Sequence, residues 1–143
     1  MIIHEDCLLT ITMRDEQGLF YILPGGGQEH GETLAQTLQR ECHEEIGVSV
    51  NCGEVIYVRE YIGRNHTFSR KHVHFHQLEV VFLCSIDDPS KAAIGAGSDN
   101  LQVGLRWLPL AELNTQRFFP KALAPLLSRR EFPLQPIYLG DLN

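Results

Sequence analysis

Three glutamates, Glu41, Glu44 and Glu45, stand at spacings of three and four residues in a segment without helix breakers. On a helix these spacings bring all three carboxylates to one side. Exposed like charges at such spacings cost about 0.2–0.5 kcal/mol per pair, and half-buried carboxylates without a partner cost more. A bound cation would offset this repulsion, and carboxylate oxygens are ligands that suit Mg²⁺ or Mn²⁺. The alternative without a bound ion is a solvated acidic helix face.

The residues around these glutamates are compatible with a metal site. Arg40 stands four residues before Glu44, so it can pair with that carboxylate and hold it in place. The run Pro24-Gly25-Gly26-Gly27 precedes the helical segment. Glycines let backbone carbonyl and N–H groups approach a metal ion or a phosphate closely. The combination would suit a divalent cation held beside a phosphate group, while the solvated acidic face stays open on these residues alone.

The segment from Gly26 to Val48 resembles the Nudix box, G-x₅-E-x₇-R-E-U-x-E-E-x-G-U, where U is a bulky apolar residue. Seven positions fall in register: Gly26, Glu32, Arg40, Glu41, Glu44, Glu45 and Gly47. Cys42 replaces the usual larger residue at the first U, which predicts slightly looser packing and no loss of chemistry. Leu23-Pro24-Gly25-Gly26 and Trp107-Leu108-Pro109-Leu110 are similar to segments that flank the box in this family.

The resemblance implies one Nudix hydrolase domain over residues 1–143, with an α/β/α sandwich fold and a mixed sheet. It implies that a metal-activated water cleaves the diphosphate linkage of a nucleoside diphosphate derivative, a small nucleotide-type substrate. Mg²⁺ is the expected cofactor, with Mn²⁺ as the alternative. The implied metal ligands are Glu41, Glu44, Glu45 and the carbonyl of Gly26. Arg40 would orient the glutamates, Glu32 would support the loop before the helix, and Gly47 belongs to the same structural framework. The general base would be one of these glutamates or a carboxylate from elsewhere.

Local signals predict the helix that must carry these groups. Thr33 and Gln36 have the spacing of a capping box, and Gly47 suits the left-handed position after the last turn. A helix is therefore predicted over Thr33–Ile46. Its apolar residues recur every fourth position and form a buried stripe of Leu34, Leu38, Cys42 and Ile46.

The remaining elements follow from apolar runs and turn residues. Val73–Ile86 is predicted as a central strand, because both of its faces are apolar from Leu78 onward. The other predicted elements are strands at Cys7–Met13, Leu19–Leu23, Val48–Tyr61 (one or two strands around an Asn51-Cys52-Gly53 turn) and Leu105–Leu108, a helical turn at Leu110–Leu113, a helix at Pro120–Arg130 and an irregular tail. The interleaving favours an α/β fold with a mixed sheet between helices.

Bulk properties limit the classes of partner. The 143 residues suit one compact domain, and the net charge of −6 argues against binding a nucleic-acid duplex. It does not argue against a small anion, since a bound cation reverses the local field. The four cysteines lack zinc-ligand spacing and are predicted to be reduced and structural. Neither a signal peptide nor an apolar span is visible, so a soluble cytoplasmic protein that does not enter membranes is expected.

Weaker candidates lie outside the box. Arg59 and Arg70 are candidates for gripping phosphates, although an ordinary surface role fits each equally well. Tyr61 is a candidate for stacking on a base, while core packing is the preferred interpretation for Tyr57 and Trp107. Glu79 lies in an apolar strand and is either a further ligand or base, or part of an internal salt bridge.

A histidine row and one downstream pair leave further alternatives open. His72, His74 and His76 alternate, so they face one side of the predicted strand. They form either a transition-metal site or a solvated or substrate-lining face, and His74 is the one taken as a substrate candidate. Asp99 and Gln102 precede the Trp107 strand and are candidates for substrate specificity.

Two other functions fit the same scaffold. One is a non-catalytic Nudix-fold sensor that binds a nucleotide without cutting it. The other is isomerisation of a prenyl diphosphate, since a fold does not dictate chemistry. The complete set of box carboxylates favours hydrolysis over both. The signatures of the ADP-ribose, NADH and coenzyme A subgroups are missing, so the substrate stays open. Many relatives of this family are dimers, and a homodimer is compatible with this chain.

Overall fold

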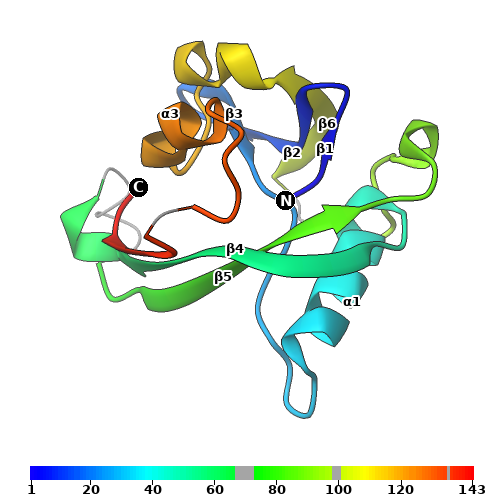
Figure 1. Ribbon diagram of the computed structural model, residues 1–143, viewed down its shortest axis with the longest axis horizontal. Coiled ribbons are helices and arrows are strands. Elements are labelled where there is room, and N and C mark those ends of the chain that lie inside the picture. The colour runs from blue at the N-terminus through cyan, green and yellow to red at the C-terminus, as the bar shows by residue number, and fades with distance from the viewer. Residues whose placement is uncertain (67–72, 98–100, 135) are drawn as a thin grey trace.

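The computed structural model describes residues 1–66, 73–97, 101–134 and 136–143 of the chain. Strand β2 (Cys7–Asp15) is the centre of a four-stranded antiparallel sheet (Figure 1). It pairs with β6 (Gln102–Pro109) along one edge, and with β1 (Ile3–His4) and β3 (Gly18–Ile22) along the other. This sheet therefore places Gln102 and the other residues of β6 before Trp107 next to β2.

The second sheet has three strands, with β4 (Asn51–Ile62) in the middle. Strand β5 (His76–Ser85) pairs with β4 in the antiparallel sense, whereas β7 (Tyr138–Asp141) pairs with it in parallel, so this sheet is mixed. The first two residues of the chain connect the sheets. Ile2 forms a parallel bridge with Cys84, and the N-terminal ammonium group of Met1 donates to the carbonyl of Phe82 over 2.8 Å.

Helical segments cover both faces of β2, which is the layered arrangement that the sequence predicts. Helix α1 (Leu34–Ile46) supplies Cys42 and Ile46 to a core with Leu9 and Ile11. On the opposite face, Leu8 belongs to a core with residues of three short helical segments, η3 (Leu110–Thr115), η4 (Lys121–Leu123) and α3 (Ala124–Leu127). Figure 1 shows α1 and α3 on opposite sides of the molecule. Successive side chains of β2 point to opposite faces and thus pack into two cores. The α/β fold is confirmed.

The prediction of Val73–Ile86 as a central strand is wrong. β5 begins at His76 and lies at the edge of its sheet, where Leu78 is 63% exposed. The end of β5 at Cys84 packs against the residues around α1, and Val81 and Leu83 pack against the other core, whereas the end at His76 is exposed. The strand that is covered on both faces is β2. Apolar content alone misled here, because it does not say how far a strand reaches past the layers that cover it.

Four further expectations also change. The Asn51-Cys52-Gly53 turn is absent, since β4 runs through these residues and accommodates them with irregularities in its pairing. The helix predicted over Pro120–Arg130 is reduced to η4 and the single turn of α3, because Pro125 lacks the N–H that a continuous helix would use. Leu34 is exposed, so the buried stripe of α1 begins later. β7 forms in the tail that was expected to be irregular. Two short 3-10 segments, η1 (Gly63–Asn65) and η2 (Pro89–Lys91), complete the described elements.

Candidate active site

The helix that carries the box glutamates has the predicted caps at both ends. The backbone nitrogen of Gln36 donates to Oγ1 of Thr33 over 3.3 Å, and the backbone nitrogen of Thr33 donates to Oε1 of Gln36 over 2.8 Å. Gly47 ends the helix with a φ of 69°, in the left-handed region where a side chain is disfavoured. These local bonds fix where the first turn begins, and so they fix which side of α1 carries the glutamates.

Arg40 lies at the centre of the box. Its Nη1 donates to Oε1 of Glu41 over 2.8 Å and to Oε2 of Glu44 over 3.3 Å. Its Nη2 donates to the carbonyl of Gly27 over 3.0 Å, and its Nε donates to Oε1 of Glu32 over 2.7 Å. One guanidinium group therefore connects the loop before the helix with three carboxylates. The planar, five-donor geometry of Arg suits this task in a way that a Lys ammonium does not.

Glu32 joins the box loop to the first turns of α1. Its Oε2 accepts from the backbone nitrogen of Glu29 over 3.0 Å and from the hydroxyl of Thr37 over 2.8 Å, in addition to the bonds from Arg40. Hydrogen bonds from Arg40, and then from the Glu29 backbone and Thr37, lower the pKa of Glu32 to about 2. The hydrogen bonds that Arg40 donates to Glu32 and Glu41 in turn raise the pKa of Arg40, whose guanidinium is charged in any case. Thr37 is a member of this network that sequence reasoning missed.

Glu45 is held by the glycine loop. Its Oε2 accepts from the backbone nitrogen of Gly25 over 2.8 Å, and Gly25 has a φ of 136° that a side chain would strain. Gly26 lies against Glu41 so closely that a Cβ there would come within 2.5 Å of both carboxylate oxygens. The backbone of this loop therefore contacts two of the three candidate ligands.

The donor set fits a hard divalent cation. The carboxylates of Glu32, Glu41, Glu44 and Glu45 against the single charge of Arg40 leave about three negative charges on one patch. Among the described residues, no three His, Cys, Asp or Glu side chains are already arranged around a metal position. The reason is visible for Glu41 and Glu44, whose carboxylates point to Arg40. Glu44 is still 43% exposed, whereas Glu41 is 15% exposed, so the two differ in how openly they meet solvent.

The structure does not bring the weaker substrate candidates to this patch. Strand β4 begins at Asn51, on the side of the molecule where α1 lies (Figure 1), and Arg59 lies near its other end. The eight residues from Asn51 to Arg59 correspond to roughly 26 Å of strand. Arg59 is 6% exposed; its Nε donates to Oε2 of Glu79 over 2.7 Å, and its Nη1 donates to the carbonyl of Leu142. The internal salt bridge, which was the alternative for Glu79, is what the structure contains. This placement gives no support to a phosphate-gripping role for Arg59.

Tyr61 and the histidines belong to the same end of the ribbon. The Tyr61 ring stacks on His66 at 5.2 Å between centroids, and His66 pairs with Asp141 of β7. His76 contacts Oε2 of Glu60 at 2.8 Å. His74 is exposed in a turn before β5, so the expected row on one strand face is wrong for this residue. Arg70, His72 and Asp99 lie outside the described residues. Tyr57 and Trp107 pack in the cores, as preferred from the sequence.

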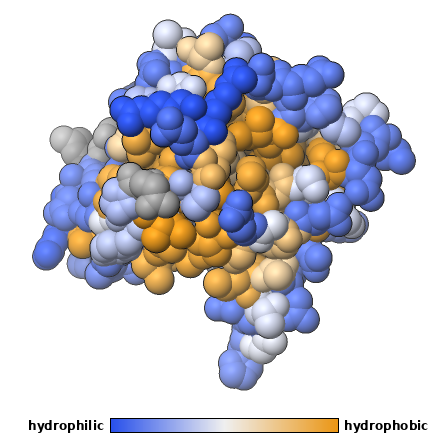
Figure 2. Space-filling model, in the orientation of Figure 1, coloured by the Kyte–Doolittle hydropathy of each residue, from blue (hydrophilic) through white to orange (hydrophobic). Residues whose placement is uncertain are grey.

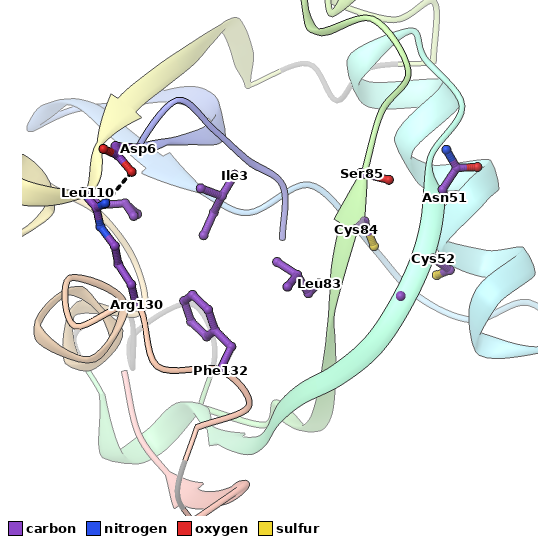
Figure 3. A pocket seen from close by; sticks show the side chains of 11 residues that line it. Ile3, Asp6, Asn51, Cys52, Leu83, Cys84, Ser85, Leu110, Arg130 and Phe132 are labelled. Atoms are coloured by element: carbon purple, nitrogen blue, oxygen red, sulfur yellow. Dashed lines mark ion pairs between the residues drawn. The ribbon is translucent and has the colours of Figure 1, made fainter.

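A cavity of about 580 Å³ opens elsewhere on the molecule (Figure 3). Its walls come mainly from Ile3, Leu83, Leu110 and Phe132, together with Cys52 and Cys84, and none of its lining residues belongs to the box. Its charged residues, Asp6 and Arg130, are paired with one another. Figure 2 shows hydrophobic residues across the centre of the face of the molecule that is drawn there, whereas the protruding lower end is largely hydrophilic. The size of this cavity therefore does not make it the candidate site, because the box carboxylates and the glycine loop that contacts them lie at α1.

Comparisons with known proteins agree with the fold. The sequence profile of the NUDIX domain matches residues 2–129, so the chain belongs to the Nudix family. A nucleoside triphosphatase NudI from Salmonella arizonae is 40% identical over 50 residues, which are 33% of this chain and 36% of that protein. The matched segment thus spans about a third of the length of that relative.

Solved structures show the same fold. A NUDIX hydrolase from Nitrosomonas europaea superposes with a TM-score of 0.66 and 19% identity over 90% of this chain and 83% of that chain. An ADP-ribose pyrophosphatase from Streptococcus suis superposes with a TM-score of 0.58 and 18% identity over 98% of this chain and 92% of that chain. At these identities the similarity shows the fold alone. No helix within the described ranges is long and apolar enough to cross a membrane.

Proposed function

We propose that the protein is a metal-dependent hydrolase that cleaves the diphosphate linkage of a nucleoside diphosphate derivative. The observation that carries the proposal is the placement of three glutamates beside the loop Gly25–Gly27. Glu45 and Glu41 contact the loop directly, and Arg40 links Glu41 and Glu44 to the carbonyl of Gly27. A solvated acidic helix face needs neither these backbone contacts nor a shared guanidinium group. Membership of the Nudix family and the match to a nucleoside triphosphatase support the same assignment.

Each box residue has a defined task in this proposal. Glu41, Glu44, Glu45 and the carbonyl of Gly26 would hold Mg²⁺, or Mn²⁺ in its place. The bound ion would neutralise phosphate charge and lower the pKa of the attacking water. Arg40 holds Glu41 and Glu44 close together before the ion binds, which limits the repulsion between them. Glu32 holds Arg40 in turn, and one of the box glutamates or another carboxylate accepts the proton of the water.

The test is a panel assay on the purified chain. The panel contains nucleoside triphosphates, ADP-ribose, nucleotide sugars and dinucleoside polyphosphates, each with Mg²⁺ and with excess EDTA. We expect at least one compound to release phosphate, pyrophosphate or nucleoside monophosphate with Mg²⁺ and none with EDTA, read by ³¹P NMR. Hydrolysis in ¹⁸O-labelled water then identifies the phosphorus that the water attacks.

Variants connect this activity to the box. Glu44→Gln and Glu45→Gln each remove a ligand charge with little change of shape, and we expect kcat to fall by roughly 10²–10⁴-fold. Glu112→Gln, an exposed glutamate of η3, is the matched control and should keep the wild-type rate. Equal turnover by all four proteins would contradict the mechanism. Tight nucleotide binding without turnover across the whole panel would instead favour the sensor.

A further inference from the structure

Residues 93–97, which lie between β5 and β6 in the chain, pack on the last turn of α1. Backbone nitrogens of Ala93, Gly95 and Gly97 donate to the carbonyls of Ile46, Glu45 and Glu44, each over 3.1 Å. The last carbonyls of an α-helix have no partner within the helix. Here a segment from about fifty residues away supplies the donors. Two of the three carbonyls belong to glutamates of the box.

Gln102 adds a second donor at the same place. Its Nε2 donates to the carbonyl of Glu45 over 2.8 Å, so this carbonyl accepts from both Gln102 and Gly95. Gln102 is 9% exposed and is the first residue of β6, where it pairs with Met13 of β2. The turn that carries Glu44 and Glu45 is thereby tied to the central strand of the sheet.

The side chain of Gln102 has one buried polar atom without a partner among the described residues, which lowers the stability of the fold. Its Oε1 is buried and has no hydrogen-bond partner in the part of the chain that the structure describes. An unsatisfied buried acceptor typically destabilises a fold, and an apolar side chain of similar size would avoid this. A residue whose only role were packing would therefore be expected to be apolar here. The donor end, at the Glu45 carbonyl, is the part of Gln102 that does something a Leu cannot.

The two glycines are required for close approach. A Cβ on Gly95 would lie 2.1 Å from the carbonyl oxygen of Glu44, and a Cβ on Gly97 would lie 3.0 Å from Cβ of Glu44. Neither glycine has a φ in the left-handed region, so backbone conformation does not explain them. Their lack of a side chain lets the loop backbone lie directly against the Glu44 turn.

We propose that Gly95 and Gln102, with Gly97, are positioning residues that set where the Glu44 and Glu45 carboxylates stand. This inference rests on the function proposed above. The loop and Gln102 hold the backbone of the turn from its C-terminal side, while Gly25 and Arg40 hold its carboxylates from the other. A displacement of about 1 Å at a catalytic group can lower a rate by about 10²-fold, so this bracing bears directly on kcat.

The experiment uses two variants and one control in the full chain. Gly95→Ala forces the loop away from the Glu44 carbonyl, and Gln102→Leu removes the donor together with the unsatisfied acceptor. Gly104→Ala is the matched glycine control in β6, because its Cβ would meet Thr12 only at an ordinary 3.8 Å. The measurements are kcat and KM, thermal unfolding, and the ¹H–¹⁵N NMR signals of the α1 amides.

We expect Gln102→Leu to keep or raise Tm while kcat falls about 10-fold and KM changes less than about 3-fold. Gly95→Ala should lower kcat by about 10²-fold and shift the amide signals of Glu44 and Glu45. A fall in Tm with unchanged kcat in both variants would overturn the proposal and leave only helix capping. The NMR comparison needs no substrate, so it stands if the panel shows no turnover. Amide signals of Glu44 and Glu45 that match those of Gly104→Ala would then overturn it.

Discussion

The backbone nitrogen of Gly25 lies 2.8 Å from Oε2 of Glu45, so the glycine loop holds a carboxylate that stands twenty residues further along the chain. Gly25 makes this contact with a φ of 136°, a conformation that other residues rarely adopt. The geometry of the loop and the position of the Glu45 side chain are therefore coupled. Changes in the loop should consequently appear as changes in the chemistry at α1.

Gly26→Ala tests this coupling at the neighbouring position. The added Cβ would stand 2.5 Å from Cδ and both Oε atoms of Glu41, so the carboxylate has to move. Because a side-chain end can swing away, we expect Tm to change little while kcat falls by about 10–100-fold. Gly27→Ala is the control, since nothing lies within 4 Å of its Cβ. Steady-state kinetics decide the matter: equal kcat values for the two variants would remove Gly26 from the proposed site.

Arg40→Lys tests whether a positive charge alone at position 40 is enough to hold the box carboxylates in place. Lysine keeps the positive charge but cannot reach Glu32, Glu41 and Gly27 with separate donors. We expect a lower Tm and a kcat reduced about 10-fold or more, with Arg40→Ala more severe in both. Arg129→Lys, at an exposed position, should match the wild type. A double-mutant cycle of Arg40→Ala with Glu32→Gln, followed by thermal unfolding, should be non-additive because the two side chains share their bonds. Additive losses would argue against a connected network.

Acid unfolding should report on Glu32. Its pKa is lowered in the fold from 4.5 to about 2, so its carboxylate stabilises the protein above the unfolded pKa, and this contribution is lost as the pH falls from about 4.5 to about 2. Glu32→Gln should flatten the decline of Tm in that window. Asp141, whose pKa is also lowered to about 2 by Asn65, the Ile62 backbone and His66, should still contribute in the variant. An unchanged pH profile in Glu32→Gln would contradict the assignment.

Glu79→Gln separates an internal salt bridge from a catalytic role. Arg59 is a buried residue with 6% exposure, and the change leaves its guanidinium without its charged partner. Loss of one partner of a fully buried pair costs about 3–5 kcal/mol, and the 27% exposure of Glu79 reduces this to about 1–3 kcal/mol. Urea unfolding measures the loss. We expect kcat to stay within about 3-fold of the wild type, because Glu79 lies away from α1. A fall of 10²-fold in kcat would restore Glu79 as a ligand or base. Arg59→Met with Glu79→Leu should recover most of the stability.

The box helix was predictable because its determinants are local. Thr33, Gln36 and Gly47 set the ends of α1 through bonds within a few residues. The strands were found less well. β5 was placed at the centre of a sheet and β7 was missed, because strand partners depend on segments far apart in the chain. Arg59 and Tyr61 were candidates by residue type, and their position at the far end of β4 is a property of the sheet.

The spacing of Glu41, Glu44 and Glu45 by itself determined that three carboxylates share one side of a helix, since helical periodicity is a property of the local backbone. The sequence also determined that Arg40 can reach Glu44 one turn on. Only the tertiary structure decided what holds these groups: the Gly25 amide, the Ala93–Gly97 loop and Gln102. Each of these contacts joins residues that are distant along the chain. Their meeting follows from the packing of both sheets against α1, which no local pattern encodes.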